Sequence, residues 1–113
     1  MSLNQVIVSG RLGKDPEIRQ AGSKSVAGFT LAVDDFREGK KATTWVYVEA
    51  WEKLADTVGK FLTKGNRTAI VGRLREDTWE GNNGEKKSRM KVIADRVEII
   101  DYPEKEDDDK VPF

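Results

Sequence analysis

The sequence predicts an all-β domain with one short helix, and three observations support this fold class. Apolar and polar residues alternate along several short segments, which is the period of a half-buried strand. Glycine, proline and asparagine separate these segments and indicate turns. Only residues 54–62 have the spacing of an amphipathic helix. A chain of 113 residues is large enough for one hydrophobic core and too small for two.

Three strands are expected before the helix. The first covers about residues 4–12 and ends at the loop signature Gly13-Lys14-Asp15-Pro16. An irregular piece follows to Ser25, and residues 26–34 form the second expected strand. The charged residues 35–43 contain a glycine and are expected to form an exposed loop or hairpin tip. Residues 44–51 form the third expected strand.

One helix and two further strands are expected to follow. The helix face comprises Leu54, Val58, Phe61 and Leu62, and Gly65 suits its end. Residues 67–75 are rich in β-formers, and residues 77–85 contain a turn-rich hairpin tip at Gly81-Asn82-Asn83-Gly84. A fifth strand is expected from about residue 87 towards residue 100, with an interruption near Ala94-Asp95. The order of three strands, a helix and two strands fits the five-stranded Greek-key barrel called the OB-fold.

The third expected strand carries the clearest functional signal. Its core face comprises Val46, Val48 and Ala50, and the opposite face comprises Trp45, Tyr47, Glu49 and Trp51. Glu49 is expected to resist burial, so this second face is expected to be exposed. Large rings beside cations form a platform on which nucleobases stack. The alternative is that the tryptophans cover a subunit or core contact.

Aromatic rings and cations together predict a site for single-stranded nucleic acid. The candidate stacking residues are Phe36, Trp45, Trp51 and Trp79. The candidate phosphate-binding residues lie among them and are Arg11, Arg37, Lys53, Arg73, Arg75, Lys86, Lys87 and Arg89. Stacking and phosphate contacts are both insensitive to base sequence. A duplex reader would more often present a helix to the major groove.

The formal net charge of zero conceals a split between the two parts of the chain. Residues 1–100 contain 18 Lys and Arg against 14 Asp and Glu, whereas residues 101–113 contain two lysines against six acids. We therefore expect a polyanion-binding domain at 1–100 and a separate interaction tail at 101–113.

Composition argues against several other functions. The chain contains no Cys and no His, so we expect no disulfide, metal site, cofactor or catalytic activity. No apolar stretch approaches the roughly 18 residues of a membrane span. The first residues lack the pattern of a secretory leader, and a cytoplasmic location is expected.

The chain closely resembles bacterial single-stranded DNA-binding proteins. The resemblance rests on motifs in a fixed order, which are Asn4 with Val6, residues 10–19, 29–33, Thr44-Trp45, 51–56, 61–65, Gly72-Arg73-Leu74, Trp79 and the acidic end 107–113. It implies stacking on Phe36, Trp45, Trp51 and Trp79, and basic contacts at Lys53 and Arg75. It also implies a homotetramer that binds and protects single-stranded DNA at the nucleoid during replication, recombination and repair. The implied docking site for partner proteins comprises Asp107, Asp108, Asp109, Pro112 and Phe113.

This chain departs from the family pattern in three places. Residues 101–106 replace a long linker, Lys110 interrupts the acidic tip, and Glu76 and Asp77 precede Trp79. The alternatives within the same fold are a primosomal replication protein, a protein-interaction module and a nuclease. A primosomal protein would lack the acidic Pro-Phe tip, and a nuclease would require a carboxylate metal cluster.

Overall fold

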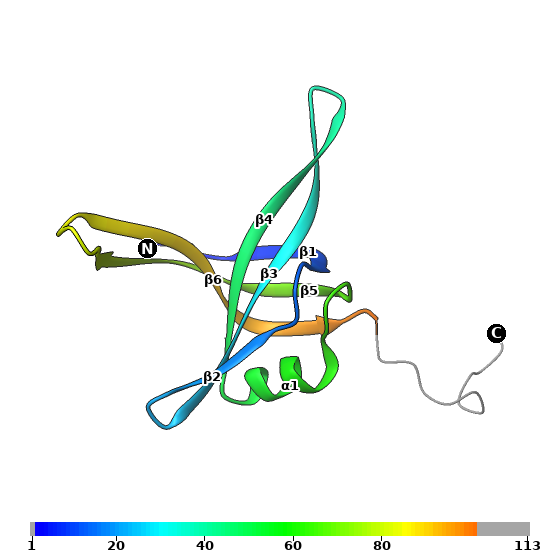
Figure 1. Cartoon of the computed structure of the whole chain (residues 1–113). Helices are drawn as coiled ribbons and strands as arrows, with labels where there is room; N and C mark the ends of the chain where they lie inside the picture. Colours follow the sequence, from blue (N-terminus) through cyan, green and yellow to red (C-terminus); the bar gives the residue numbers. More distant parts are fainter. Residues whose placement is uncertain (1, 102–113) are drawn as a thin grey trace.

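The computed structural model describes residues 2–101. It contains six strands and one helix, which are β1 (Val6–Leu12), β2 (Glu17–Ala21), β3 (Lys24–Arg37), β4 (Lys40–Trp51), α1 (Lys53–Phe61), β5 (Arg67–Glu80) and β6 (Lys86–Ile99). Figure 1 shows the strands wound around one another, with α1 below them and two hairpin arms projecting outward. The arms are the β3–β4 hairpin at the top and the β5–β6 hairpin at the left.

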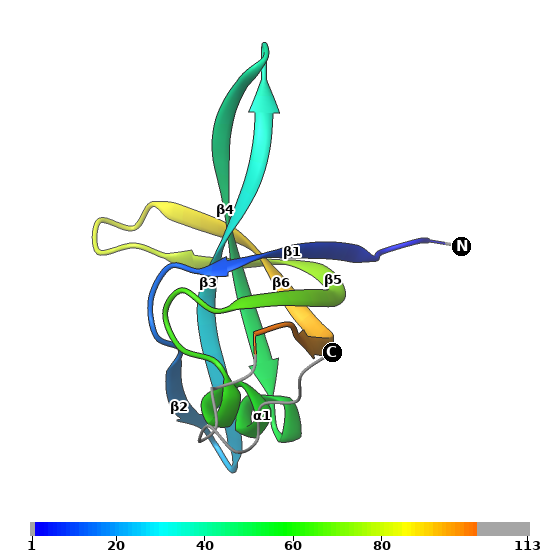
Figure 2. The same cartoon turned by 90° about the vertical axis from the view of Figure 1, so that its right-hand side faces the viewer.

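Five of the six strands close a barrel. The strand order is β1-β5-β6-β4-β3-β2, and a further pairing of β1 with β3 joins the sheet to itself. All neighbours are antiparallel except β4 and β6, which pair in parallel at Val48↔Val92 and Glu49↔Ile93. Figure 2 shows β3 and β4 crossing β1, β5 and β6 at a steep angle. The prediction of a five-stranded Greek-key barrel with one helix is therefore confirmed.

The hydrophobic core lies inside the barrel and under α1. Its largest fully buried residues include Leu31, Val48, Val58, Ile70 and Val92. The predicted apolar face of the helix is confirmed at Val58, and Leu62 follows the last helical residue and is also buried. Burial of this face supports a helix too short to be stable by itself in water.

Strand β2 contradicts the sequence prediction of an irregular piece before residue 25. Residues Glu17–Ala21 pair with the first part of β3 through a turn at Gly22, whose φ is +66°. Four of the five β2 residues are exposed, so the strand lacks an apolar alternation that would reveal it. Residues Glu17–Ala21 therefore form a strand because they pair with β3, and their own composition does not account for it.

Both arms are longer than the sequence predicted. The segment 35–43 is strand except at Glu38-Gly39, which both have positive φ and form a two-residue turn. Strand β5 continues beyond Arg75 to Glu80. The expected interruption of the last strand is a bulge instead of a break. Val71 pairs with Arg96 and Gly72 with Ala94, which leaves Asp95 as the extra residue.

The start of β1 is fixed by a side chain. The Asn4 amide donates to the backbone oxygen of Leu74 at 2.9 Å, and its side-chain oxygen accepts from the Leu74 backbone N–H at 2.9 Å. The amide thus takes the place of one more strand pair between β1 and β5.

Candidate nucleic-acid interface

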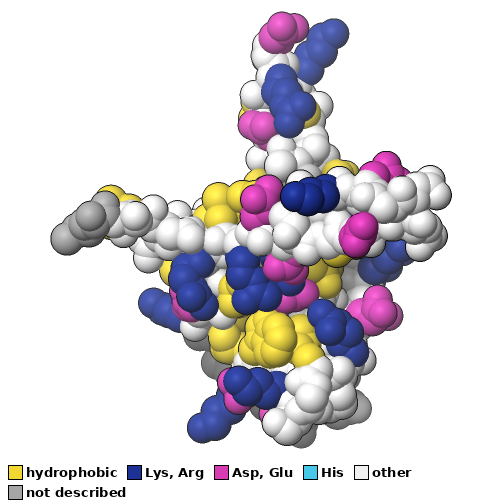
Figure 3. Space-filling model, turned by 90° about the vertical axis from the view of Figure 1, so that its left-hand side faces the viewer, with side chains coloured by type: hydrophobic (Ala, Val, Ile, Leu, Met, Phe, Trp, Pro, Cys, Tyr) yellow, Lys and Arg dark blue, Asp and Glu magenta, His cyan; other side chains and the backbone are white. Residues whose placement is uncertain are grey.

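The outer face of β4 carries aromatic rings, as the sequence predicted. Val48 and Ala50 are fully buried on the core face, whereas Trp45 on the opposite face is 61% exposed. Figure 3 shows that hydrophobic side chains in the middle of one face of the molecule are surrounded by Lys, Arg and carboxylate side chains. Exposed rings among cations are what stacking of unpaired bases requires.

Two glycines allow the rings on β4 to lie close against the barrel. A Cβ atom on Gly13 would lie 2.7 Å from the ring of Trp45, and one on Gly28 would lie 2.3 Å from the Tyr47 hydroxyl. The Arg89 guanidinium lies 3.7 Å from the centre of the Tyr47 ring and covers it. Trp45 is therefore a supported and accessible ring, whereas Tyr47 is already stacked on a cation.

Trp51 is less accessible than Trp45. It lies at the end of β4 and is half-buried, and its indole Nε1 is buried without a hydrogen-bond partner among residues 2–101. Part of this ring therefore packs against the barrel, which the sequence offered as an alternative for both tryptophans.

The other two predicted stacking rings lie on the arms. Phe36 is 71% exposed on the β3–β4 arm, and Trp79 is 48% exposed on the β5–β6 arm opposite Lys87. The structure therefore does not gather the four rings at one point. It places Trp45 and Trp51 on the barrel, with Phe36 and Trp79 on separate projections from it (Figure 1).

The strand registers place an arginine in the same row as each barrel tryptophan. Arg11 pairs with Ala32, which pairs with Trp45. In the same way, Arg19 pairs with Val26, which pairs with Trp51. Two strand spacings of about 4.8 Å separate each arginine from its ring, so both arginines belong to this face.

Most of the predicted arginines are paired with carboxylates. Arg11 lies 3.6 Å from Asp101 and donates to the Gly65 oxygen at 2.9 Å. Arg37, Arg73 and Arg75 each lie 3.4 Å from an acid, respectively Asp35, Asp95 and Asp77. Each of these four side chains is more than half exposed.

The predicted lysines fall into two groups. Lys53 is exposed at the first residue of α1, and Lys87 is exposed on β6 opposite Trp79. Lys86 is also exposed, but strand alternation directs it to the other face of β6 from Lys87 and Arg89. Lys86 is thus separated from the other cations of the predicted set.

The prediction that Glu49 resists burial is wrong. Glu49 is only 2% exposed, and its carboxylate lies 2.9 Å from the Lys91 ammonium and 3.2 Å from the Arg19 guanidinium. Lys91 is 7% exposed and also contacts Asp77. Two cations on other strands thus compensate the buried charge.

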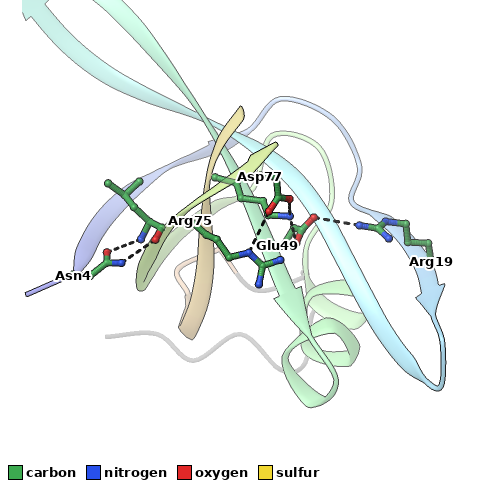
Figure 4. A network of polar contacts seen from close by, with 7 residues as sticks. Asn4, Arg19, Glu49, Arg75 and Asp77 are labelled. Carbon is green, nitrogen blue, oxygen red and sulfur yellow. Dashed lines mark hydrogen bonds and ion pairs between the residues drawn. The ribbon is translucent and has the colours of Figure 1, made fainter. Parts of the chain in front are cut away.

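A chain of alternating charges therefore crosses this face. It runs from Arg75 through Asp77, Lys91 and Glu49 to Arg19. Figure 4 labels the two carboxylates and the two arginines at its ends. The ammonium of Lys91, which donates to the Asp77 carboxylate, is the largest influence on Asp77 and lowers its pKa below the ordinary value of 3.8. Burial opposes this effect, and the charge of Arg75 adds to it. Asp77 is therefore held in its ionised form.

Sequence reasoning missed three residues of this network and its surroundings. Arg19 lies on β2, which was not expected to be a strand, and Lys91 was counted only as part of the last strand. Tyr47 was placed on the correct face but not among the binding residues. The tail residues Asp107, Asp108, Asp109, Pro112 and Phe113 lie outside the described residues.

The described residues offer no metal site of the usual kind. Within residues 2–101, no three His, Cys, Asp or Glu side chains come together in a way that could hold a metal ion. No helix in the same part of the chain is long and apolar enough to cross a membrane.

Three kinds of comparison place the chain among known proteins. A model of the single-strand binding protein family matches residues 3–100. The chain is 36% identical over 105 residues to single-stranded DNA-binding protein 1 of Chlorobaculum tepidum, covering 87% of this chain and 65% of that protein. It is 33% identical over 112 residues to single-stranded DNA-binding protein 1 of Staphylococcus aureus, covering 96% of this chain and 71% of that protein.

A solved structure is also similar to this chain. The Plasmodium falciparum SSB complex with ssDNA superimposes with a TM-score of 0.81 at 28% sequence identity, covering 89% of this chain and 97% of that chain. The chain spans 61–65% of the length of the Chlorobaculum tepidum, Listeria innocua and Neisseria meningitidis relatives.

Proposed function

Because this chain belongs to the single-strand binding protein family, we propose that it binds single-stranded DNA without regard to base sequence. The observation that carries the proposal is the exposed Trp45 ring on β4, supported by Gly13 and lying in one cross-strand row with Arg11. Stacking on exposed rings supplies sequence-tolerant affinity, and nearby guanidinium groups contact phosphates. The proposed activity is DNA binding without catalysis. The proposed location is the cytoplasm, at the nucleoid.

A titration of intrinsic tryptophan fluorescence tests this function. Oligothymidine and a mixed-sequence single strand should quench the fluorescence strongly and with similar affinity, and a duplex of the same sequence should bind much more weakly. Equal affinity for duplex and single strand would contradict the proposal. Absence of any change with single strands would favour the protein-interaction module instead.

We also propose that the protein assembles as a homotetramer. Its support in the structure is the first strand, because Ile7 is 69% exposed and β1 pairs with β3 only at Arg11 and Leu12. The rest of that β1 edge has no strand partner among residues 2–101, and an exposed edge with an apolar residue favours pairing with another chain. Light scattering should give about four times 12.7 kDa without DNA, and a monomer at micromolar concentration would contradict the assembly.

The tail is proposed to recruit replication, recombination and repair proteins through Asp107, Asp108, Asp109, Pro112 and Phe113. Phe113 is the only large apolar side chain at this acidic end, so it is expected to contribute most of the docking energy. Pull-downs from a bacterial extract should recover such proteins with the wild-type chain and lose them when Phe113 is deleted. Identical recovery with a 1–100 truncation would show that the tail only aids solubility.

A further inference from the structure

The alternating charges on the outer face are unequally exposed. The Glu49 and Lys91 side chains are 3% and 7% exposed, whereas Arg19 and Arg75 at the two ends are 51% and 52% exposed. Asp77 lies between these extremes at 40%. The network therefore presents two guanidinium groups to solvent and holds its central ammonium inside.

Both carboxylates lie among the rings of the proposed binding face. Glu49 lies between Tyr47 and Trp51 on the same side of β4. Asp77 lies two residues before Trp79 on the same side of β5. A strand of DNA whose bases stack on these rings would therefore bring its phosphates close to two fixed negative charges.

The carboxylates already make the contacts that phosphates would make. Glu49 lies 3.2 Å from a terminal nitrogen of Arg19, and Asp77 lies 3.4 Å from Nε of Arg75. Carboxylate and phosphate oxygens accept the same charge-assisted hydrogen bonds from guanidinium groups. The three cations and two carboxylates leave a net charge of +1 where three unpaired cations would give +3. The network therefore neutralises fewer phosphates and releases fewer of the counterions condensed on the DNA.

We propose that Glu49 and Asp77 are built-in counter-charges that lower single-strand affinity and reduce its salt dependence. In this arrangement Arg19 and Arg75 contact the DNA backbone, and Lys91 holds both carboxylates in place without touching DNA. This inference rests on the proposed function of single-strand binding. It identifies Arg19 as a DNA contact and the two acids as residues that set affinity.

Neutral replacements of the two acids test the proposal in the full-length chain. Glu49→Gln keeps a side-chain oxygen for Lys91 but releases Arg19, and Asp77→Asn releases Arg75 in the same way. The matched control is Glu98→Gln, because exposed Glu98 pairs with exposed Arg96 outside this network. Oligothymidine affinity is measured by tryptophan quenching at 50 and 200 mM NaCl.

Each acid variant should bind more tightly and depend more steeply on salt. Full neutralisation of one more phosphate on a single strand changes the slope of log K against log salt by about 0.7, so the gain should be about 2.5-fold larger at 50 mM than at 200 mM. Glu98→Gln should match wild type. Adding Arg19→Gln to Glu49→Gln should abolish the gain, because Arg19 is the cation that the first change releases.

If wild type binds oligothymidine, four results would overturn the inference. Two concern the acid variants: both keep the wild-type affinity and salt slope, or a folded acid variant binds more weakly than wild type. The other two are an equal gain in affinity in Glu98→Gln and a gain in Glu49→Gln that persists when Arg19→Gln is added. If Glu49→Gln loses its cooperative melting transition, Asp77→Asn decides, because its half-exposed side chain is not part of the core. Failure of wild type itself to bind oligothymidine would instead refute the proposed function.

Discussion

Truncating Trp45 should separate DNA affinity from protein stability. The ring is 61% exposed and rests against Gly13, so Trp45→Ala removes little area that folding buries. We expect the free energy of unfolding to change by less than about 1 kcal/mol. If one base stacks on this ring, the affinity for oligothymidine should fall by about 1–3 kcal/mol, or about 5- to 150-fold.

Trp51 supplies the contrast for the same experiment. Its ring is half-buried and its Nε1 is enclosed, so Trp51→Ala should lower both stability and affinity. Loss of a partly packed aromatic ring should cost about 2 kcal/mol of unfolding free energy, below the 3–5 kcal/mol typical of fully buried rings. Trp45→Phe serves as the control, because it keeps an aromatic face at the exposed position and should retain most of the affinity.

The assay combines urea unfolding, followed by circular dichroism, with competition for a labelled oligothymidine, followed by fluorescence anisotropy. Competition is needed because intrinsic quenching changes when a tryptophan is removed. If Trp45→Ala remains folded and binds within two-fold of wild type, Trp45 does not stack a base. If Trp45→Phe loses as much affinity as Trp45→Ala, the indole makes a contact other than stacking.

Three further predictions concern the frame of the site. Glu52 has φ 57° and ψ −118°, a conformation that favours glycine, so Glu52→Gly should raise the urea unfolding free energy by about 1 kcal/mol. Lys91→Met should lower the free energy of unfolding by about 3 kcal/mol, because the buried Glu49 then keeps only Arg19, which is half-exposed, as a partner. Adding Glu49→Leu to this variant should restore most of the lost stability. The folded state lowers the pKa of Asp77 below its ordinary value of 3.8, so the ionised side chain stabilises the protein above pH 3.8. This stabilisation is lost as the pH falls through the folded pKa. Urea unfolding from about pH 6 to pH 2 should therefore show the difference between wild type and Asp77→Asn shrinking below pH 3.8, and a constant difference would contradict this origin.

The barrel was predictable because its strands have two different faces. Along β4, alternation identified Val48 and Ala50 as core residues and Trp45 as an outer one, and the structure confirms each. The arms and β2 were not predictable in this way, because most of their residues are exposed on both faces. There, backbone pairing with a neighbouring strand extends the ladder, and single-sequence patterns do not report pairing.

Glu49 illustrates a different limit of sequence reasoning. Considered alone, a glutamate in a strand is expected at the surface because burial of an unpaired carboxylate is costly. Its burial depends on Lys91, which β6 brings beside β4 through their short parallel pairing, and on Arg19 from β2. The three residues are far apart in the sequence, and no local pattern relates them. The same separation explains why Arg19 was missed.

The structure also changes the expected contributions of aromatic stacking and of electrostatics to DNA affinity. The sequence predicted cations among the rings, and the structure places Arg11, Arg37, Arg73 and Arg75 each within 3.6 Å of a carboxylate. A paired arginine displaces fewer counterions from DNA, because a carboxylate already neutralises part of its charge. Stacking on the exposed rings does not depend on counterion release. On this face, aromatic stacking should therefore supply the larger share of affinity at high salt, and the carboxylates limit how much the cations add at low salt.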